Sequence, residues 1–137
     1  MRVLALDYGS ARCGAAVSDP SGTLATPLEP VLRPATRRGF GRLTALAREL
    51  EAERVLVGLP LALGGRDTAQ TAEARAFAAR LQAALSIPVE MHDERFTTVL
   101  ARRVGGGASE DSRAAALLLL DWLEDPARMP SAQAGES

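Results

Sequence analysis

Lysine is absent from the 137 residues, and cysteine, histidine, tryptophan and tyrosine occur once each. With a single cysteine, Cys13, no disulfide can form within the chain, so we expect a protein of the reducing cytoplasm. Cys13 itself is expected to pack as a small hydrophobic residue. No apolar run is long enough to span a bilayer, and the N-terminus lacks a signal-peptide pattern. These absences favour a cytoplasmic protein and disfavour a membrane protein or a disulfide scaffold.

Acidic and basic residues are nearly balanced in number. Sixteen basic residues, all of them arginine, stand against seventeen acidic residues, and the formal net charge is −1. Overall charge therefore does not by itself indicate a nucleic-acid-binding protein, although arginine is well suited to forked contacts with phosphate. With 47% apolar residues, a chain of 137 residues can bury a core as one domain. We expect this single domain to span residues 1–125, followed by a flexible C-terminal tail over 126–137.

One stretch near the N-terminus asks for a functional explanation. An apolar run over residues 3–7 ends at Asp7, Gly9 and Gly14 bracket a tight turn, and a second apolar run ends at Ser18. This pattern predicts two antiparallel strands, with Asp7 near the end of a buried strand. A lone buried carboxylate is costly, so Asp7 is expected to be paired or to bind a metal ion.

Strands and helices alternate along the remainder of the chain. The prolines of the next strand place it at a sheet edge, where a missing backbone donor does least harm. Caps are expected at Thr36 for the first helix and at Asp67, with Gln70 in the capping-box position, for the second. The predicted strands are 23–32, 54–58 and 87–91, and the predicted helices are 36–52, 68–85, a short one after residue 98, and one from Ser109 or Asp111 to about residue 123.

Helical connections precede the last two strands. Right-handed crossovers would lay both of them parallel to the first strand. We therefore expect an α/β fold with a mixed five-stranded sheet flanked by helices, in which a three-stranded antiparallel part adjoins two parallel strands. Open α/β sheets bind ligands at the switch point beside the C-terminal end of the first strand, and Asp7 lies there.

Three carboxylates can converge at this switch point: Asp7, Glu94 just beyond the fifth strand, and Asp111 at the start of the last helix. An all-oxygen cluster suits Mg²⁺ or Mn²⁺ rather than zinc. Two such ions about 4 Å apart could activate water and stabilise the leaving oxygen in phosphodiester hydrolysis. Each residue also has a simpler interpretation: Asp7 as a turn residue, Glu94 as a loop charge paired with Arg95, and Asp111 as a helix cap beside a competing ligand, Glu110.

Several arginines are placed to bind phosphate. Arg12, Arg66 and Arg95 lie on loops predicted to border the same end of the sheet, where they would hold phosphates or balance the carboxylates. Solvated surface charge is the alternative for each of them. The pairs 37–38 and 102–103 fit either contact with a nucleic-acid backbone or a solvated helix face. The remaining aromatic candidates are assigned to packing: His92 to a strand end and Trp122 to the core.

Four strings of residues stand out in the chain: LDYGSARCGAAVSD (6–19), VGLPL (57–61), DERFTT (93–98) and DSRAA (111–115). Together they resemble the YqgF (RuvX) family of small bacterial nucleases, which are similar in fold to ribonuclease H and the RuvC junction resolvase. The resemblance covers roughly residues 1–124 in the family's order. The resemblance implies a ribonuclease H-like fold, with Asp7, Glu94 and Asp111 as the catalytic residues and metal ligands, and two Mg²⁺ or Mn²⁺ ions.

The resemblance also implies a substrate, structured nucleic acid. RNA is favoured, in maturation of the 5′ end of 16S ribosomal RNA, with a four-way DNA junction as the alternative. Family members often carry lysine and asparagine where this chain has Ala11 and Ala62, which bears on substrate preference more than on the reaction. A resolvase acting symmetrically would be a homodimer, an expectation that comes from function alone.

Two other functional classes remain to be weighed. Actin-like kinases and ATPases also open with an Asp-x-Gly turn, but they need a second domain that 137 residues cannot supply. A non-catalytic nucleic-acid-binding module would bind without cleaving, and the retained carboxylates argue against it.

Overall fold

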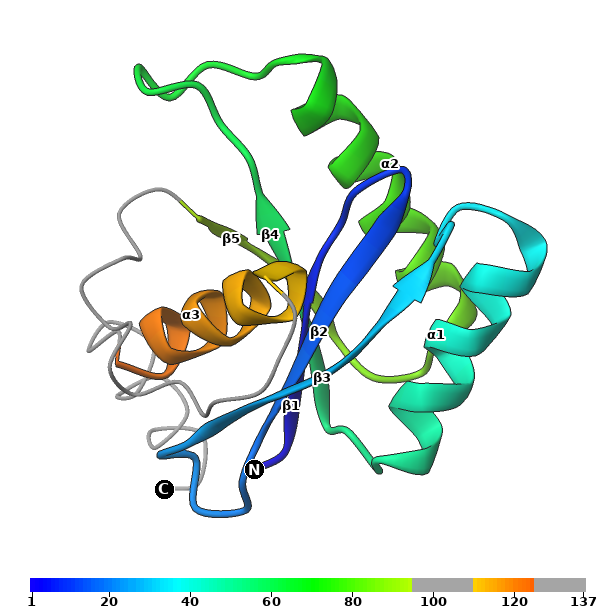
Figure 1. The fold of residues 1–137 in the computed structure, drawn as a ribbon, viewed down its shortest axis with the longest axis vertical. Helices are drawn as coiled ribbons and strands as arrows, with labels where there is room; N and C mark the ends of the chain where they lie inside the picture. The colour runs from blue at the N-terminus through cyan, green and yellow to red at the C-terminus, as the bar shows by residue number, and fades with distance from the viewer. Residues whose placement is uncertain (95–109, 125–137) are drawn as a thin grey trace.

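The computed structural model describes residues 1–94 and 110–124, except for the side chains of Glu110 and Asp111. A five-stranded sheet has the order β3-β2-β1-β4-β5 (Figure 1). β1 and β2 are antiparallel, as are β2 and β3, whereas β4 runs parallel to both β1 and β5. The mixed sheet predicted from the sequence is thereby confirmed. The elements are β1 (Val3–Asp7), β2 (Arg12–Ser18), β3 (Ala25–Leu32), α1 (Arg37–Glu49), β4 (Arg54–Leu59), α2 (Ala69–Ala84), β5 (Val89–Asp93) and α3 (Glu110–Glu124).

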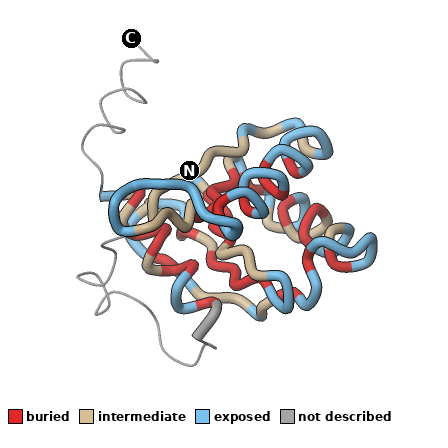
Figure 2. The backbone as a smooth tube through the Cα atoms, turned by 90° about the horizontal axis from the view of Figure 1, so that it is seen from above, coloured by how far each residue is buried: buried red, intermediate tan, exposed pale blue. Residues whose placement is uncertain are grey.

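Helices cover both faces of the sheet, with α1 and α2 on one face and α3 on the other (Figure 1). Buried residues concentrate along the strands and on the inner sides of the helices, while the outer sides are exposed (Figure 2). Strands covered on both faces need apolar residues at successive positions rather than alternate ones, which explains the continuous apolar run in β1.

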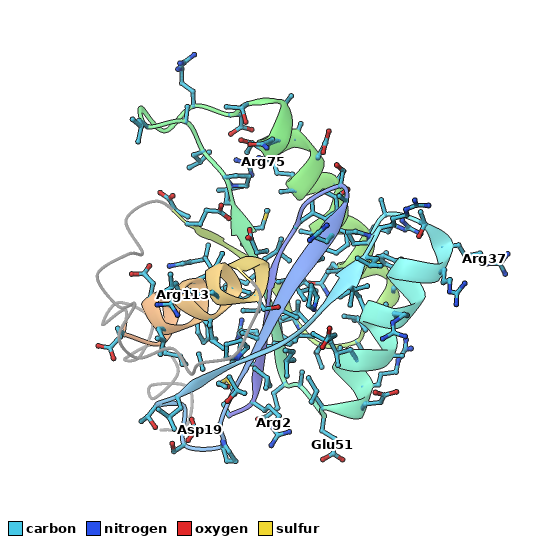
Figure 3. The ribbon with its side chains drawn as sticks, viewed as in Figure 1. Arg2, Asp19, Arg37, Glu51, Arg75 and Arg113 are labelled. Carbon is cyan, nitrogen blue, oxygen red and sulfur yellow. The ribbon has the colours of Figure 1, made fainter. Side chains whose placement is uncertain are left out.

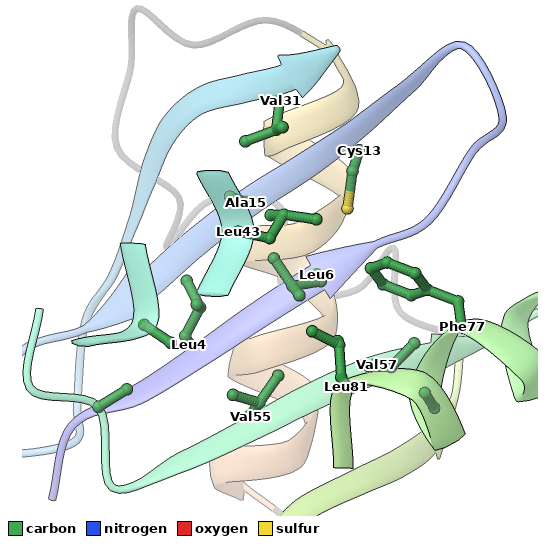
Figure 4. Packing of buried hydrophobic residues seen from close by; sticks show 13 residues of the cluster. Leu4, Leu6, Cys13, Ala15, Val31, Leu43, Val55, Val57, Phe77 and Leu81 are labelled. Atoms are coloured by element: carbon green, nitrogen blue, oxygen red, sulfur yellow. The ribbon is translucent and has the colours of Figure 1, made fainter. Parts of the chain in front are cut away.

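Alternation within each strand divides the core into two clusters. Leu4 and Leu6 of β1 point toward α1 and α2, where they meet Phe77 and Leu81 (Figure 4). Val3 and Ala5, which alternate with these leucines along the strand, point toward α3. The α3 cluster is completed by Ala16, Ala25, Leu56, Ala115, Ala116, Leu118, Leu119, Leu120 and Trp122. As expected, Cys13 and Trp122 are core residues.

The caps of the first two helices illustrate one correct and one wrong prediction. Thr36 caps α1, because its hydroxyl accepts the Gly39 N–H at 3.1 Å. Asp67 was the predicted cap of α2, and that prediction is wrong. Thr68 is the cap, and it forms a reciprocal capping box with Thr71. A threonine at the third helical position can return the hydrogen bond to the cap's N–H, and here it does so at 2.9 Å.

Strand boundaries differ from the sequence prediction mainly at β5. The strand begins at Val89 rather than at residue 87 and continues to Asp93. β3 forms the edge of the sheet, as its prolines predict. The short helix expected after residue 98, the glycine run at 105–107 and the tail over 126–137 lie outside the described residues. Among the helices of the described part, none is long and apolar enough to cross a membrane.

Candidate active site

Asp7 lies at the C-terminal end of β1, on the face of the sheet that α3 covers. Val3 and Ala5 pack in the α3 cluster, and side chains two residues apart in a strand share a face. Asp7 therefore continues this face beyond the apolar residues. It is only partly buried, and it pairs with Gly14 of β2. A buried strand thus delivers a carboxylate to the accessible end of the sheet.

Glu94 follows β5 on the same face. Two residues of β5 contact α3: the Glu90 carboxylate accepts the Trp122 indole N–H at 2.8 Å, and His92 Nε2 lies 2.7 Å from the Asp121 carboxylate. Alternation then places Glu94, two residues after His92, toward α3 as well. Its N–H donates to the Leu59 carbonyl at 3.3 Å, which holds the residue against the end of β4.

Gly58 of β4 separates the two carboxylates. The registers pair Leu6 with Val57 and Gly58 with His92, so position 58 is flanked by the ends of β1 and β5. A Cβ built on Gly58 would lie 2.2 Å from Oε2 of Glu94 and 3.2 Å from Cδ2 of Leu118. Only glycine leaves the space that the Glu94 carboxylate occupies. That carboxylate can therefore reach across β4 toward Asp7.

The electrostatics of Glu94 show how closely these groups approach. Burial raises the pKa of Glu94 to about 7, and the negative charges of Asp7 and then Asp93 add to the effect. Asp93 is the last residue of β5, and the sequence analysis did not identify it as part of this site. Carboxylate oxygens that repel one another are stabilised by a hard divalent cation such as Mg²⁺ or Mn²⁺, so the donor set fits such an ion. Among the described residues, no group of three His, Cys, Asp or Glu side chains is arranged to hold a metal.

The first turn of α3 lies beside the same site. The Ala15 N–H donates to the Ser112 hydroxyl at 3.3 Å, and that hydroxyl donates to the Leu28 carbonyl. Ser112 is fully buried, so its hydroxyl fixes the start of α3 over β2 and β3. Ala15 adjoins Gly14, the partner of Asp7. Asp111 immediately precedes Ser112, which places its backbone near the site, while its side chain lies outside the described part.

Ser112 was missed by the sequence analysis. A serine in the first turn of a helix usually serves that helix itself, and nothing local distinguishes one that bridges two strands. Its proximity to the sheet depends on contacts between residues far apart in the chain, at separations of 97 and 84 residues.

The arginines predicted to bind nucleic acid lie in different places. Arg12 begins β2, is exposed, and stands two residues before the Gly14 that pairs with Asp7. Arg66 is exposed in the loop between β4 and α2, where its carbonyl accepts the Ala62 N–H at 2.9 Å. Arg95 falls outside the described residues. Exposure of Arg12 and Arg66 agrees equally with phosphate contact and with solvated charge.

Comparisons with known proteins identify the family. The model of the RuvX family, described as a Holliday junction resolvase, matches residues 1–125. A protein of Koribacter versatilis is 42% identical over 132 residues, covering 90% of this chain and 86% of its own. A protein of Clavibacter michiganensis subsp. michiganensis is 46% identical over 131 residues, covering 88% and 81%. Both relatives carry the name "Putative pre-16S rRNA nuclease".

Solved structures agree on the fold. Thermus thermophilus RuvC in complex with a Holliday junction substrate superposes with a TM-score of 0.62 at 18% identity, covering 96% of this chain and 97% of its own. The yeast mitochondrial Holliday junction resolvase Ydc2 gives a TM-score of 0.52 at 9% identity, covering 88% and 77%. At such identities the likeness concerns the fold alone, and it confirms the predicted ribonuclease H-like class.

Proposed function

Because the chain belongs to the RuvX family, whose model matches residues 1–125, we propose that it is a divalent-metal-dependent nuclease acting on structured RNA. The substrate is precursor 16S ribosomal RNA, with cleavage at its 5′ end. Two relatives above 40% identity carry the name "Putative pre-16S rRNA nuclease". One observation carries the proposal. Asp7 ends β1 and Glu94 follows β5, on either side of β4; the Glu94 carboxylate occupies the space that a Cβ on Gly58 would take, and the charge of Asp7 raises its pKa.

The roles of the residues follow from their positions. Asp7 and Glu94 supply oxygen ligands to divalent metal ions, and Asp111 supplies a third set from the first turn of α3. When bound, such ions polarise a phosphoryl oxygen and lower the pKa of a coordinated water. Asp7 ends a strand, Glu94 directly follows one, and the backbone of Asp111 lies in the first turn of α3, so regular elements would position the ligands before substrate arrives. Arg12, Arg66 and Arg95 hold the phosphates on either side of the scissile bond.

The test is cleavage of a structured precursor RNA with Mn²⁺ or Mg²⁺, comparing the unaltered protein with Asp7→Asn and Glu94→Gln. Loss of an oxygen ligand removes metal-dependent stabilisation of several kcal/mol, so each variant is expected to lose about 100-fold or more in rate. Glu51→Gln is the matched control, because this exposed carboxylate lies at the far end of α1 (Figure 3). Normal turnover by Asp7→Asn would remove Asp7 from the site and contradict the proposal.

A second substrate deserves the same assay. The family description names a Holliday junction resolvase, and four-way DNA junctions are therefore the alternative. Symmetric cutting of a junction needs two active sites, so this alternative includes a homodimer. Cleavage of a junction but not of precursor RNA, by a protein that sediments as a dimer, would support the alternative. Binding of both substrates without cleavage of either would indicate a non-catalytic module.

A further inference from the structure

The charges at the start of α1 oppose the dipole of the helix. Arg33, Arg37 and Arg38 lie before and within its first turn, which contains no acidic residue, whereas the C-terminal end has both a base, Arg48, and the acids Glu49 and Glu51. Helices are stabilised by acids in the first turn and bases in the last. Figure 3 shows Arg37 and Glu51 at opposite ends of the helix. The arginines at the start of α1 therefore do not stabilise the helix itself.

The three arginines are exposed, and they lie in a stretch of the chain that lacks acidic residues. Between residues 30 and 48 the chain carries five arginines and no aspartate or glutamate. None of the ion pairs found within residues 1–94 and 110–124 involves Arg33, Arg37 or Arg38. Arg42, one turn further along, differs because it lines a hollow together with Glu29 and Glu49. We therefore define the α1 arginine surface as Arg33, Arg37 and Arg38 alone.

This surface adjoins the end of the sheet that carries Asp7. The Arg33 N–H donates to the Ala11 carbonyl at 2.9 Å, which ties the start of the β3–α1 connection to the β1–β2 turn. The connection is also fixed from α2, because Arg80 donates to the Ala35 carbonyl at 2.7 Å. Leu32, the last residue of β3, is two strands away from β1 in the sheet order, so at strand spacings of about 4.8 Å it lies at least roughly 10 Å from Asp7. The arginines follow Leu32 in the chain and continue onto the face of the sheet that α1 covers, opposite to the α3 face on which Asp7 lies.

We propose that the α1 arginine surface binds the phosphate backbone of the nucleic acid that flanks the scissile bond. The proposal rests on the proposed nuclease function and adds the direction in which the substrate leaves the active site. Arginine forks match phosphate geometry, and contacts of this kind position a substrate without reading its sequence. At a rise of about 3.4 Å per nucleotide, roughly 10 Å corresponds to about three nucleotides, so the contacted phosphates lie at least that far beyond the cleaved bond.

The experiment measures binding as a function of salt, separately from cleavage. Asp7→Asn serves as the parent protein, and the probe is structured RNA with duplex flanks of about ten base pairs on both sides of the cleavage point. Each arginine–phosphate contact contributes about 0.9 to the slope of log affinity against log salt. Adding Arg37→Gln and Arg38→Gln is expected to reduce that slope by about 1 to 2. Arg37→Lys with Arg38→Lys keeps the charges and should keep most of the slope.

Arg48→Gln is the matched control. It removes one exposed arginine from the same helix, at the end where the Arg48 guanidinium donates to the Ala84 carbonyl. This variant should leave the slope unchanged, whereas Arg37→Gln alone should lower it by about 0.9. One RNA flank would run toward α1. When that flank is shortened to fewer than three nucleotides, the parent and the double variant should show the same slope of log affinity against log salt.

The outcomes separate this proposal from the nuclease assignment. An unchanged slope in the double variant, or an equal decrease in Arg48→Gln, would overturn the α1 arginine surface. If the double variant still lowered the slope after the RNA flank on the α1 side had been trimmed, the proposed path would also be overturned. Cleavage by the unaltered protein is assayed independently, so a failure of the α1 arginine surface is distinguished from a failure of the nuclease function. Thermal unfolding of the double variant should occur at the same or a higher temperature, because removing these charges relieves the conflict with the helix dipole.

Discussion

Gly58 controls the approach of two carboxylates that lie 87 positions apart in the chain. Its Cα–H faces α3, where any other residue would place a Cβ. The space is instead filled by the Glu94 carboxylate, whose pKa is raised by its burial and by Asp7. A single missing side chain therefore allows a charged cluster to form at a strand end that is otherwise apolar.

Gly58→Ala tests this role directly. The new methyl group would meet the end of the flexible Glu94 side chain and Cδ2 of Leu118, both of which can shift, so the fold should persist with a loss of about 1–3 kcal/mol. Because the Glu94 carboxylate must move, cleavage should fall by about 100-fold or more. Steady-state cleavage and urea unfolding measure the two effects. Gly41→Ala is the control, because nothing lies within 4 Å of the added Cβ in α1 and the helix should gain about 0.5–1 kcal/mol.

Glu94 also predicts how the stability of the metal-free protein depends on pH. Its pKa is about 7 in the folded protein and 4.5 in a reference peptide, so the folded state retains the proton more strongly. The stabilising contribution is full below pH 4.5 and is lost as the pH rises to about 7. In Glu94→Gln this decline should disappear from the free energy of unfolding, measured with urea in the presence of a chelator. A decline of the same size in the variant would show that other groups cause it.

At the scale of elements, α3 is fastened to the sheet at both ends. Ser112 holds its first turn to β2 and β3, and Asp121 and Trp122 hold its last turns to His92 and Glu90 of β5. The apolar side chains of α3 alone would not fix its position along the sheet. These polar contacts fix it, because hydrogen bonds require particular partners. The start of α3 is thereby kept beside Asp7, where Asp111 is needed if it is the third ligand.

Ser112→Ala is expected to weaken this attachment. The Ala15 N–H and Leu28 carbonyl both use the buried hydroxyl, so its removal should lower the free energy of unfolding by about 1–3 kcal/mol. Cleavage should fall at temperatures where the variant is still folded, because the first turn of α3 is no longer fixed. Thr44→Val provides the comparison. Its hydroxyl bonds the Gly41 carbonyl within the same helix, so its loss should cost less than about 1 kcal/mol. Equal costs in the two variants would contradict the bridging role of Ser112.

At the scale of the whole molecule, the proposed ligands come from elements that pack together only in the folded chain. Asp7 ends β1, Glu94 follows β5 and Asp111 lies in α3, and an unfolded chain cannot bring them together. An ion that binds the folded state alone stabilises it by mass action. The protein and its proposed metal site should therefore be thermodynamically linked.

Adding Mg²⁺ or Mn²⁺ should accordingly raise the unfolding temperature. At 100 times the dissociation constant, the gain in unfolding free energy is about 2.7 kcal/mol. Differential scanning calorimetry of the protein with and without the ion measures it. Glu94→Gln should show a clearly smaller rise than Glu51→Gln, which keeps the site intact. No rise at millimolar concentrations of either ion would argue against a preformed metal site.

The sequence by itself determined the elements and the end of the sheet where the site lies. The apolar run ending at Asp7, the prolines of β3 and the cap at Thr36 are local signals, because backbone period and turn chemistry depend on neighbouring residues. Right-handed crossovers then predicted that the fifth strand is parallel to the first, so Asp7 and Glu94 were expected at the same end of the sheet. The family resemblance added the roles of these residues.

Tertiary structure decided the contacts that depend on register and packing. It placed Gly58 beneath Glu94, added Asp93 to the electrostatics, gave the α2 cap to Thr68 with Thr71, and fixed α3 through Ser112. It also brought Arg33 against Ala11, which joins the arginines of α1 to the end of the sheet that carries the site. No periodic pattern in the sequence indicates these contacts. Most of them join residues distant in sequence, the cap of α2 was decided between two neighbouring candidates, and Asp93 acts on Glu94 because the fold buries that carboxylate, so the folded chain was needed to identify them.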